Sequence, residues 1–219
     1  MCEKRVILTF DDAVSSHRRF VAPLLMELGF TATFFVCEFP PDFETNKAQY
    51  MTWDEIKELD SLGFEVANHT LTHAGLNGMK PRDFEKQLLA LETRFQRYGI
   101  PKSENFAYPG GQGAAYAPPI LQKHGFKTAR ALRDAGWNVS NDDRWLIPSI
   151  PVHGPDESVF RRALGLAKPG EIPVLVYHGV PDYIHPWVDT QPEVFEREMR
   201  YLAAEGYAVL ALRDLTRNL

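Results

Sequence analysis

A unit that repeats five times along the chain constrains its fold more than any other feature of the sequence. In each unit a helical pattern ends at a glycine, and an apolar residue opens the next segment. Glycine readily adopts the left-handed conformation that ends a helix, and the apolar residue after it packs back onto the last turn. The five joints are Gly29-Phe30, Gly63-Phe64, Gly99-Ile100, Gly125-Phe126 and Gly206-Tyr207. The repeat therefore predicts a series of helices, each followed by a new element.

Short apolar runs with strand character follow these joints, and two more stand near the N-terminus and in the second half of the chain. They lie at 5–10, 32–36, 64–67, 127–131, 173–177 and 207–210, with a weaker run at 105–108. Strands that alternate with helices are typical of a parallel sheet with helical crossovers. With about seven such units, closure into a barrel is favoured over an open sheet. The sequence therefore predicts an α/β barrel.

The chain has room for one large domain and shows no boundary inside it. Its 219 residues suffice for a substantial core. No linker, low-complexity tract or block of like charge divides it, so we expect a single domain over 1–219. Residues 134–156 are rich in Asp, Asn, Pro and Gly, and we expect them to form a long loop region.

The composition disfavours several classes of partner. A net charge of −5 argues against nucleic acid and anionic membrane surfaces, and no apolar run is long enough to span a bilayer. The N-terminus lacks the basic segment and apolar core of a signal peptide. Only two cysteines occur, so a disulfide framework is not expected. We expect a cytoplasmic protein; the alternative is an exported domain whose signal has been trimmed.

Two pairs of chemically active side chains follow two of the predicted strands. Asp11 and Asp12 come directly after the first run, and His69 and His73 come after the run at 64–67. Histidines four apart lie on one face of a helical turn, so both imidazoles can reach one point. Two histidines and one carboxylate leave coordination positions open for water and substrate, and the second carboxylate is then free to accept a proton. A solvated histidine pair and an Asp-Asp turn or helix cap are the structural alternatives.

Other polar residues follow further predicted strands. Tyr108 and Gly110 come after the weak fourth run, and His178 follows the run at 173–177. In α/β barrels the chemistry lies in the loops at the carboxyl ends of the strands. These residues therefore converge with the aspartates and histidines at one end of the predicted barrel, which favours a metal-dependent hydrolase. Outside this set, we interpret His17 as a solvated residue at a helix start.

Four motifs give the chain a resemblance to a known family. They are Thr9-Phe10-Asp11-Asp12, Asn68-His69-Thr70-Leu71-Thr72-His73, Phe106-Ala107-Tyr108-Pro109-Gly110-Gly111 and Leu175-Val176-Tyr177-His178. In this order the chain resembles the polysaccharide deacetylase family, carbohydrate esterase family 4. The first two motifs together are the most specific, and the four cover nearly the whole chain.

The resemblance implies a distorted (β/α) barrel of about seven strands and a metal-dependent hydrolase that acts on N-acyl groups. It assigns the metal to Asp12, His69 and His73, the general base to Asp11 and the general acid to His178. Because the ligands are two imidazoles and one carboxylate, we expect one divalent ion and favour zinc.

Three further residues are candidates for contact with the substrate. A backbone N–H near Gly110 is placed to share the oxyanion with the metal, and Tyr108 belongs to the same motif. Trp187 stands in a long loop after His178, where an exposed indole can stack on a sugar face. Simple packing is the alternative for Trp187.

The chain also departs from the family pattern. Many members carry an arginine at the place of Ala107, where it orients the base, and an aromatic residue at the place of Gly110. For the family's fourth motif, an Asp with a Trp in the cleft, the nearest candidates are Asp142, Asp143 and Trp145, with a plain surface loop as the alternative. These departures indicate a divergent branch.

We therefore expect the protein to remove N-acetyl or O-acetyl groups from a carbohydrate. One alternative is a metal-dependent amidase of the same fold that acts on a small non-sugar or cyclic amide; release of acetate separates the two. A second alternative is a carbohydrate-binding relic without activity, although such a protein would not need Asp11. The sequence does not specify the oligomeric state.

Overall fold

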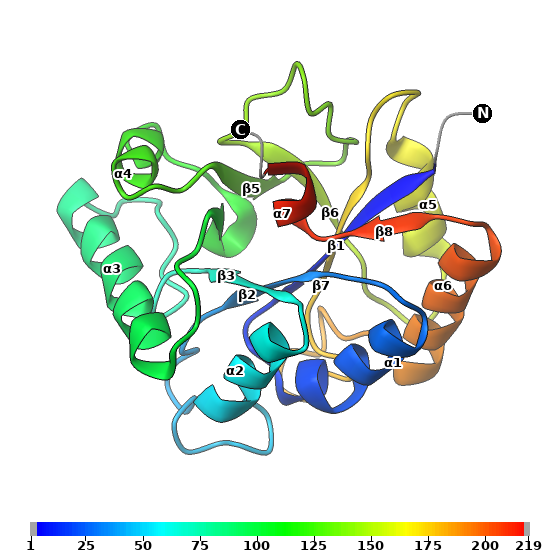
Figure 1. Ribbon diagram of the computed structural model, residues 1–219, viewed down its shortest axis with the longest axis horizontal. Coiled ribbons are helices and arrows are strands. Elements are labelled where there is room, and N and C mark those ends of the chain that lie inside the picture. The colour runs from blue at the N-terminus through cyan, green and yellow to red at the C-terminus, as the bar shows by residue number, and fades with distance from the viewer. Residues whose placement is uncertain (1–3, 217–219) are drawn as a thin grey trace.

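The computed structural model describes residues 4–216 and shows a closed barrel of parallel strands surrounded by helices (Figure 1). Seven strands form the ring in sequence order, because β1 pairs with both β2 and β7. They are β1 (Arg5–Asp11), β2 (Thr33–Val36), β3 (Glu65–Asn68), β4 (Asn105–Ala107), β5 (Thr128–Leu132), β6 (Ile147–Pro151) and β7 (Val174–Tyr177). The prediction of a barrel with about seven strands is confirmed.

The barrel is distorted at β1. The register pairs β1 with β2 only over Thr9–Asp11, at the carboxyl end of the strand. The eighth strand, β8 (Ala208–Leu210), pairs with β1 over Arg5–Ile7 and occupies the edge that β2 leaves free. The ring therefore closes at the end of β1 that carries Asp11, while the other end of β1 extends beyond the ring.

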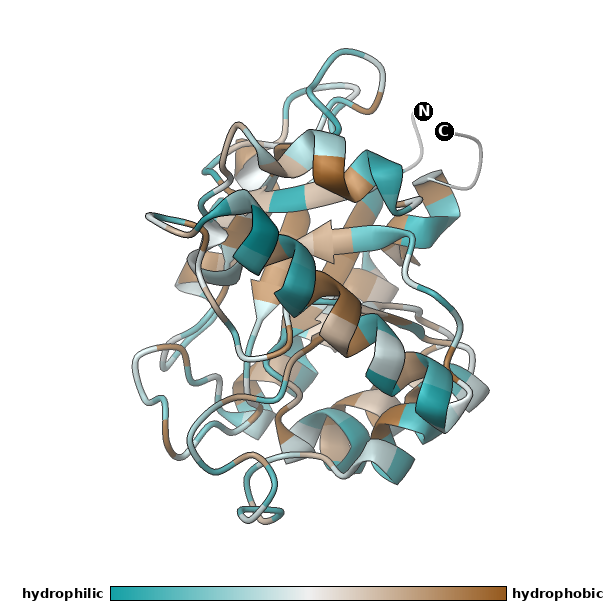
Figure 2. Cartoon of the chain, turned by 90° about the vertical axis from the view of Figure 1, so that its left-hand side faces the viewer, coloured by the Kyte–Doolittle hydropathy of each residue, from teal (hydrophilic) through white to brown (hydrophobic). Residues whose placement is uncertain are grey.

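Helices cover the outside of the ring. They are η1 (His17–Val21), α1 (Ala22–Glu27), α2 (Trp53–Ser61), α3 (Pro81–Tyr98), α4 (Ala117–Lys123), α5 (Ser158–Leu166) and α6 (Pro192–Ala204). Two short helices lie at the ends of the barrel instead: η2 (Pro109–Gly111) at the carboxyl end and α7 (Leu212–Thr216) at the amino end. Figure 2 shows largely hydrophobic strands inside and many hydrophilic residues on the outer faces of the helices. None of the helices in residues 4–216 combines the length and the apolar character that a membrane crossing requires.

All five glycine joints end helices or helical turns as the sequence predicts. Each glycine has a positive φ, between 67° at Gly99 and 93° at Gly63. At each joint the N–H of the apolar residue donates to the carbonyl five residues back, for example Phe64 to Leu59 at 3.1 Å. This is the hydrogen bond of a Schellman motif, and it fixes the direction in which the chain enters the next strand.

The prediction of a long loop over residues 134–156 is partly wrong. It contains β6, which pairs with β5 and β7 and is needed to complete the ring. Pro148 and Pro151 lie within this strand. Proline lacks the backbone donor that a strand interior uses, so a run with two prolines does not read as a central strand.

Alternation along the strands decides which side chains point into the barrel. On β1, Val6, Leu8 and Phe10 pack in the core between sheet and helices, whereas Ile7 packs with Phe35 of β2 in the barrel interior. Successive side chains of a strand point to opposite faces. Asp11, an even number of residues from Ile7, therefore points into the barrel at its carboxyl end.

The opposite end of the barrel is closed by a buried polar network. Glu65 at the start of β3 accepts hydrogen bonds from Thr33 Oγ1 at 2.7 Å and from the backbone N–H of Arg213 in α7 at 2.9 Å. In (β/α) barrels the contacts at the amino ends of the strands contribute to stability, whereas the chemistry lies at the carboxyl ends. The carboxyl end is thus the open end of the barrel.

Candidate functional site

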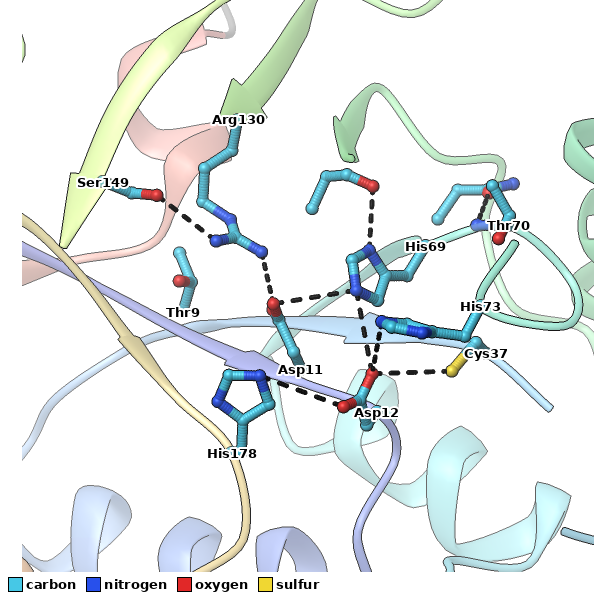
Figure 3. Close-up of polar contacts among 12 residues, drawn as sticks. Thr9, Asp11, Asp12, Cys37, His69, Thr70, His73, Arg130, Ser149 and His178 are labelled. Carbon is cyan, nitrogen blue, oxygen red and sulfur yellow. Dashed lines mark hydrogen bonds and ion pairs between the residues drawn. The ribbon is translucent and has the colours of Figure 1, made fainter. Parts of the chain in front are cut away.

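The carboxyl ends of the strands bring the expected site residues together (Figure 3). Asp11 is the last residue of β1, and Asp12 follows it. His69 directly follows β3, and His178 directly follows β7. Four positions that are up to 167 residues apart in the chain thereby face one another, as the barrel topology predicts.

Asp12, His69 and His73 form a compact donor set. One ligand atom from each lies within 4.8 Å of the others, with Asp12 Oδ1 3.7 Å from His69 Nε2 and 3.5 Å from His73 Nε2. The Nδ1–H of His69 donates to the carbonyl of Ala107 at 2.8 Å. A neutral imidazole that donates through Nδ1 presents a lone pair at Nε2, as metal ligation requires.

The electrostatics of this donor set also suit a cation. Burial raises the pKa of the Asp12 carboxyl to about 6 and lowers the pKa of His69 to about 3. Burial likewise lowers the pKa of His73. All three shifts favour uncharged protein groups in a pocket that solvates charge poorly. A divalent cation would supply the missing positive charge and favour the ionised Asp12, so the residues fit a metal ion.

The prediction that His69 and His73 lie on one face of a helical turn is wrong. Residues 69–73 form a non-helical turn in which Thr70 and His73 have positive φ values of 61° and 51°. Thr70 N donates to Asn68 Oδ1 at 2.9 Å, and Thr70 Oγ1 accepts from Ala74 N at 2.9 Å. These bonds hold the turn in a conformation that lets both imidazoles reach Asp12.

Backbone strain is concentrated in the two loops that carry the donor set. Within residues 4–216 the non-glycine residues with positive φ are Asp12, Ala13, Thr70 and His73. Each such residue typically costs about 1–3 kcal/mol, and such strain gathers at functional sites. The φ of 54° at Ala13 lies in the left-handed region, which glycine adopts at a lower cost than alanine.

Asp11 lies beside the donor set and is paired with Arg130. Its Oδ2 is 2.5 Å from Arg130 Nη2 and 3.7 Å from His69 Nε2, while its buried Oδ1 has no hydrogen-bond partner among residues 4–216. Burial alone would raise the pKa of Asp11, but the charge of Arg130, with smaller contributions from His69 and His178, lowers it overall. Asp11 is therefore an ionised carboxylate with one oxygen held by Arg130 and the other without a partner among residues 4–216.

Arg130 was not among the site residues predicted from the sequence. It lies inside β5, is 1% exposed, and donates through Nη1 to Ser149 Oγ at 3.3 Å. Its guanidinium also lies 5.1 Å from the ring centre of Phe35. The sequence signal was a single arginine in the apolar run 127–131 at a position that points inward. A buried arginine of this kind requires a carboxylate partner.

His178 reaches the same site from β7. Its Nε2 lies 3.9 Å from Asp12 Oδ2, and its side chain is 19% exposed. Its backbone carbonyl accepts a hydrogen bond from His17 Nε2 at 2.8 Å. The interpretation of His17 as solvated is wrong, because its side chain is fully buried between Phe10 and Phe34, and burial lowers its pKa to about 4. His17 is thus a neutral donor that fixes the backbone of His178.

A cavity of about 460 Å³ opens over these residues. This volume lies in the range of small-molecule sites. Tyr108, Gly110 and Trp187 all line it, together with the donor set and Arg130. Tyr108 is buried, Gly110 is exposed with a φ of 66°, and Trp187 is 68% exposed. The expected substrate-contact residues therefore border the cavity, although they differ greatly in exposure.

The nearest candidates for the family's fourth motif lie outside the cavity. Asp142 Oδ2 accepts from the backbone of Asn138, and Asp143 Oδ1 accepts from the backbone of Trp145. None of these side chains lines the cavity. They form a surface loop, the structural alternative raised from the sequence.

Comparisons with known proteins agree with the motifs. A family model described as polysaccharide deacetylase matches residues 1–129. The putative polysaccharide deacetylase YxkH of Bacillus subtilis (strain 168) is 24% identical over 125 residues, which are 57% of this chain but only 43% of that protein. The peptidoglycan-N-acetylglucosamine deacetylase of Bacillus cereus is 27% identical over 184 residues, 82% of this chain and 75% of that protein.

A solved structure shares the fold. A carbohydrate esterase family 4 pseudoenzyme from Bacillus anthracis superposes with a TM-score of 0.68 at 20% identity. The match covers 98% of this chain and 66% of that one. At this identity the likeness concerns the distorted barrel alone.

Proposed function

Because the chain belongs to the polysaccharide deacetylase family, whose model matches residues 1–129, we propose that it is a hydrolase that removes N-acetyl or O-acetyl groups from a carbohydrate. The proposal rests mainly on how four side chains are arranged at the carboxyl end of the barrel. Asp12, His69 and His73 form a donor set for a divalent ion, and the ionised Asp11 lies beside them with a free oxygen.

Zinc fits the donor set best, because two imidazole nitrogens and one carboxylate oxygen are the ligands of many catalytic zinc sites. When bound there, the ion would polarise the acyl carbonyl and lower the pKa of water at the site. The remaining steps belong to the side chains of this chain.

Asp11 is the proposed general base. It must be ionised to accept a proton from the attacking water, and Arg130 keeps its pKa low. Arg130 holds Oδ2, so Oδ1 is the oxygen left to take the proton. We therefore assign Arg130 the positioning role that an arginine at the place of Ala107 has in many relatives.

His178 is the proposed general acid. An amine departs poorly unless it is protonated as the C–N bond breaks. The partly exposed imidazole of His178 borders the cavity on the side of β7, and the buried His17 fixes its backbone. A proton on Nε2 would thus be held next to the reacting groups. Gly110, exposed in the η2 turn at the cavity, is the proposed additional donor to the oxyanion.

Acetate release tests this function against its alternatives. Purified protein loaded with zinc is assayed with N-acetylated glucosamine oligomers, acetylated xylose oligomers and cyclic amides, and both acetate and free amine are measured. We expect acetate from at least one acetylated sugar and none from an Asp11→Asn variant. Ring opening without acetate would identify an amidase for small cyclic substrates, and binding without any turnover would identify a carbohydrate-binding relic.

A further inference from the structure

An aromatic wall extends from the proposed metal ligand His73 to the rim of the cavity. The rings of His73 and Phe39 are 4.7 Å apart, those of Phe39 and His185 are 4.9 Å apart, and those of His185 and Trp187 are 5.5 Å apart. All four side chains line the cavity. The wall is therefore continuous with the site of hydrolysis.

The outer part of this wall belongs to the β7–α6 loop, residues 178–191. The loop is held by Asp182, whose side chain is fully buried. Asp182 Oδ1 accepts from Gln49 Nε2 at 3.0 Å and from the backbone N–H of His185 at 2.9 Å. Gly179 gives the carboxylate its space, because a Cβ there would lie 2.4 Å from Asp182 Cβ. These contacts hold the loop in one defined conformation.

Asp182 also sets the hydrogen-bonding character of His185. Its Oδ2 lies 3.2 Å from His185 Nδ1. A carboxylate oxygen accepts, so Nδ1 carries the hydrogen, and a neutral imidazole then has its lone pair at Nε2. That Nε2 has no hydrogen-bond partner among residues 4–216 and is not buried. His185 therefore offers an oriented acceptor in the cavity wall.

Trp187 adds a large apolar surface next to this acceptor. Its side chain is 68% exposed at the cavity rim and lies edge-on to His185, with an interplanar angle of 69°. Because Trp187 borders the cavity and is this exposed, its indole face is open to a ligand that binds there. A sugar ring matches the pair, because it has an apolar C–H face for the indole and hydroxyl groups that can donate to an imidazole nitrogen.

We propose that His185 and Trp187 form a subsite for a second sugar ring, so that the substrate is an acetylated oligosaccharide rather than a monosaccharide or a small amide. This inference rests on the proposed deacetylase function and specifies its substrate class. Hydrolysis takes place on the ring beside His73, while the neighbouring ring stacks on Trp187 and donates a hydroxyl hydrogen to His185 Nε2.

The kinetic test compares a monomer with a tetramer of the same acetylated sugar. The full chain loaded with zinc is assayed on N-acetylglucosamine and its β-1,4 tetramer, and on acetylated xylose and its tetramer. We expect at least one tetramer to have a KM about tenfold below that of its monomer, and Trp187→Ala to abolish this advantage without changing kcat. His185→Ala should act in the same direction, and His185→Gln, which retains an acceptor, should restore part of the loss.

Tyr183→Ala is the matched control. Tyr183 lies in the same loop and is 82% exposed, but it does not line this cavity. The control should keep the KM of wild type on every substrate. Because Trp187 is exposed, the melting temperature of Trp187→Ala should equal that of wild type, so that any change in KM reflects binding.

A binding measurement separates failure of this inference from failure of the proposed function. Quenching of tryptophan fluorescence by each tetramer is titrated with Asp11→Asn and with the double variant that also carries Trp187→Phe. Quenching that depends on Trp187 supports the subsite even if wild type releases no acetate. In that case only the proposed deacetylase function would be refuted. Equal affinity for monomers and tetramers, or quenching that Trp187→Phe leaves unchanged, would overturn the subsite.

Discussion

Ala107 and Arg130 are paired in register on the neighbouring strands β4 and β5, and the guanidinium of Arg130 reaches Asp11 from there. The family pattern implies an arginine that orients the base at the place of Ala107, where this chain has alanine. Both residues are fully or almost fully buried in the barrel interior. Arg130 therefore reaches Asp11 from the strand next to the one that carries Ala107.

This relationship predicts the phenotype of Arg130→Met. The substitution keeps much of the buried volume but leaves Asp11 without its cation, so kcat should fall by about a hundredfold or more. The pKa of Asp11 should rise, because Arg130 lowers it. The acid limb of the pH–rate profile should therefore move to higher pH, which steady-state kinetics across pH will measure.

A second substitution makes the test specific. Ala107→Arg in the Arg130→Ala background transfers the side chain back to the strand used by relatives, with little change in total core volume. We expect this double variant to recover part of the rate and of the acid limb. No recovery, in a protein whose melting temperature is restored, would show that Arg130 serves the fold and not Asp11.

The two adjacent aspartates should differ in their effect on metal binding. Asp12→Ala removes a proposed ligand, so zinc content should fall well below one ion per chain. Zinc should then no longer raise the melting temperature, since a ligand stabilises the folded state only as far as it binds. Asp11→Asn keeps its size and should retain the metal while losing most of the rate. Elemental analysis and thermal unfolding with and without zinc check both; loss of zinc in Asp11→Asn but not in Asp12→Ala would reverse the assignment.

The elements of the fold were largely predictable because their signals are local. Each helix-ending glycine acts within a few residues of itself, as the hydrogen bond from Phe64 to Leu59 illustrates. Strand β6 was missed because its two prolines argue against a strand, and only its neighbours β5 and β7 provide the pairing that places it in the ring.

The site was predictable where a motif carries it and unpredictable where tertiary contacts do. The positions of Asp11, Asp12, His69 and His73 follow from strand ends. The partnership of Arg130 with Asp11 depends on the register of strands 119 residues apart, which no local pattern encodes. His17 looked solvated for the same reason, since its burial results from the packing of β1, β2 and the β7–α6 loop around it.

Glu198 gives a prediction about stability rather than activity. Its carboxyl on α6 is buried, accepts a hydrogen bond from Tyr177 at 2.9 Å, and has its pKa raised by burial to about 8. An unfolded glutamate titrates near pH 4.3. Between these two pH values the folded state binds more protons than the unfolded state. The stability that the protonated Glu198 contributes is therefore fully present below about pH 4 and is lost as the pH rises towards 8.

Glu198→Gln stays neutral at every pH and can still accept the hydrogen bond from Tyr177. We expect this variant to be more stable than wild type near pH 8, by an amount on the order of a few kcal/mol, and the difference to vanish near pH 4. Glu196→Gln, on the exposed side of the same helix, is the control and should show no such pH-dependent gain. Denaturant unfolding at several pH values measures this, and a difference that is constant with pH would refute the linkage.

His178 is predicted to matter most when the leaving group is poor. Amide substrates need a proton on the departing nitrogen, whereas activated esters release their leaving groups without one. His178→Ala should therefore reduce kcat/KM for an acetamido sugar by a hundredfold or more, and for an activated acetate ester by much less. His178→Gln, which keeps a polar side chain of similar reach but cannot donate as an acid of suitable strength, should behave like His178→Ala. If both substrate types lost equal activity, the imidazole would act on the oxyanion or on the geometry of Asp12, from which it lies 3.9 Å away, and the role of proton donor would pass to another group.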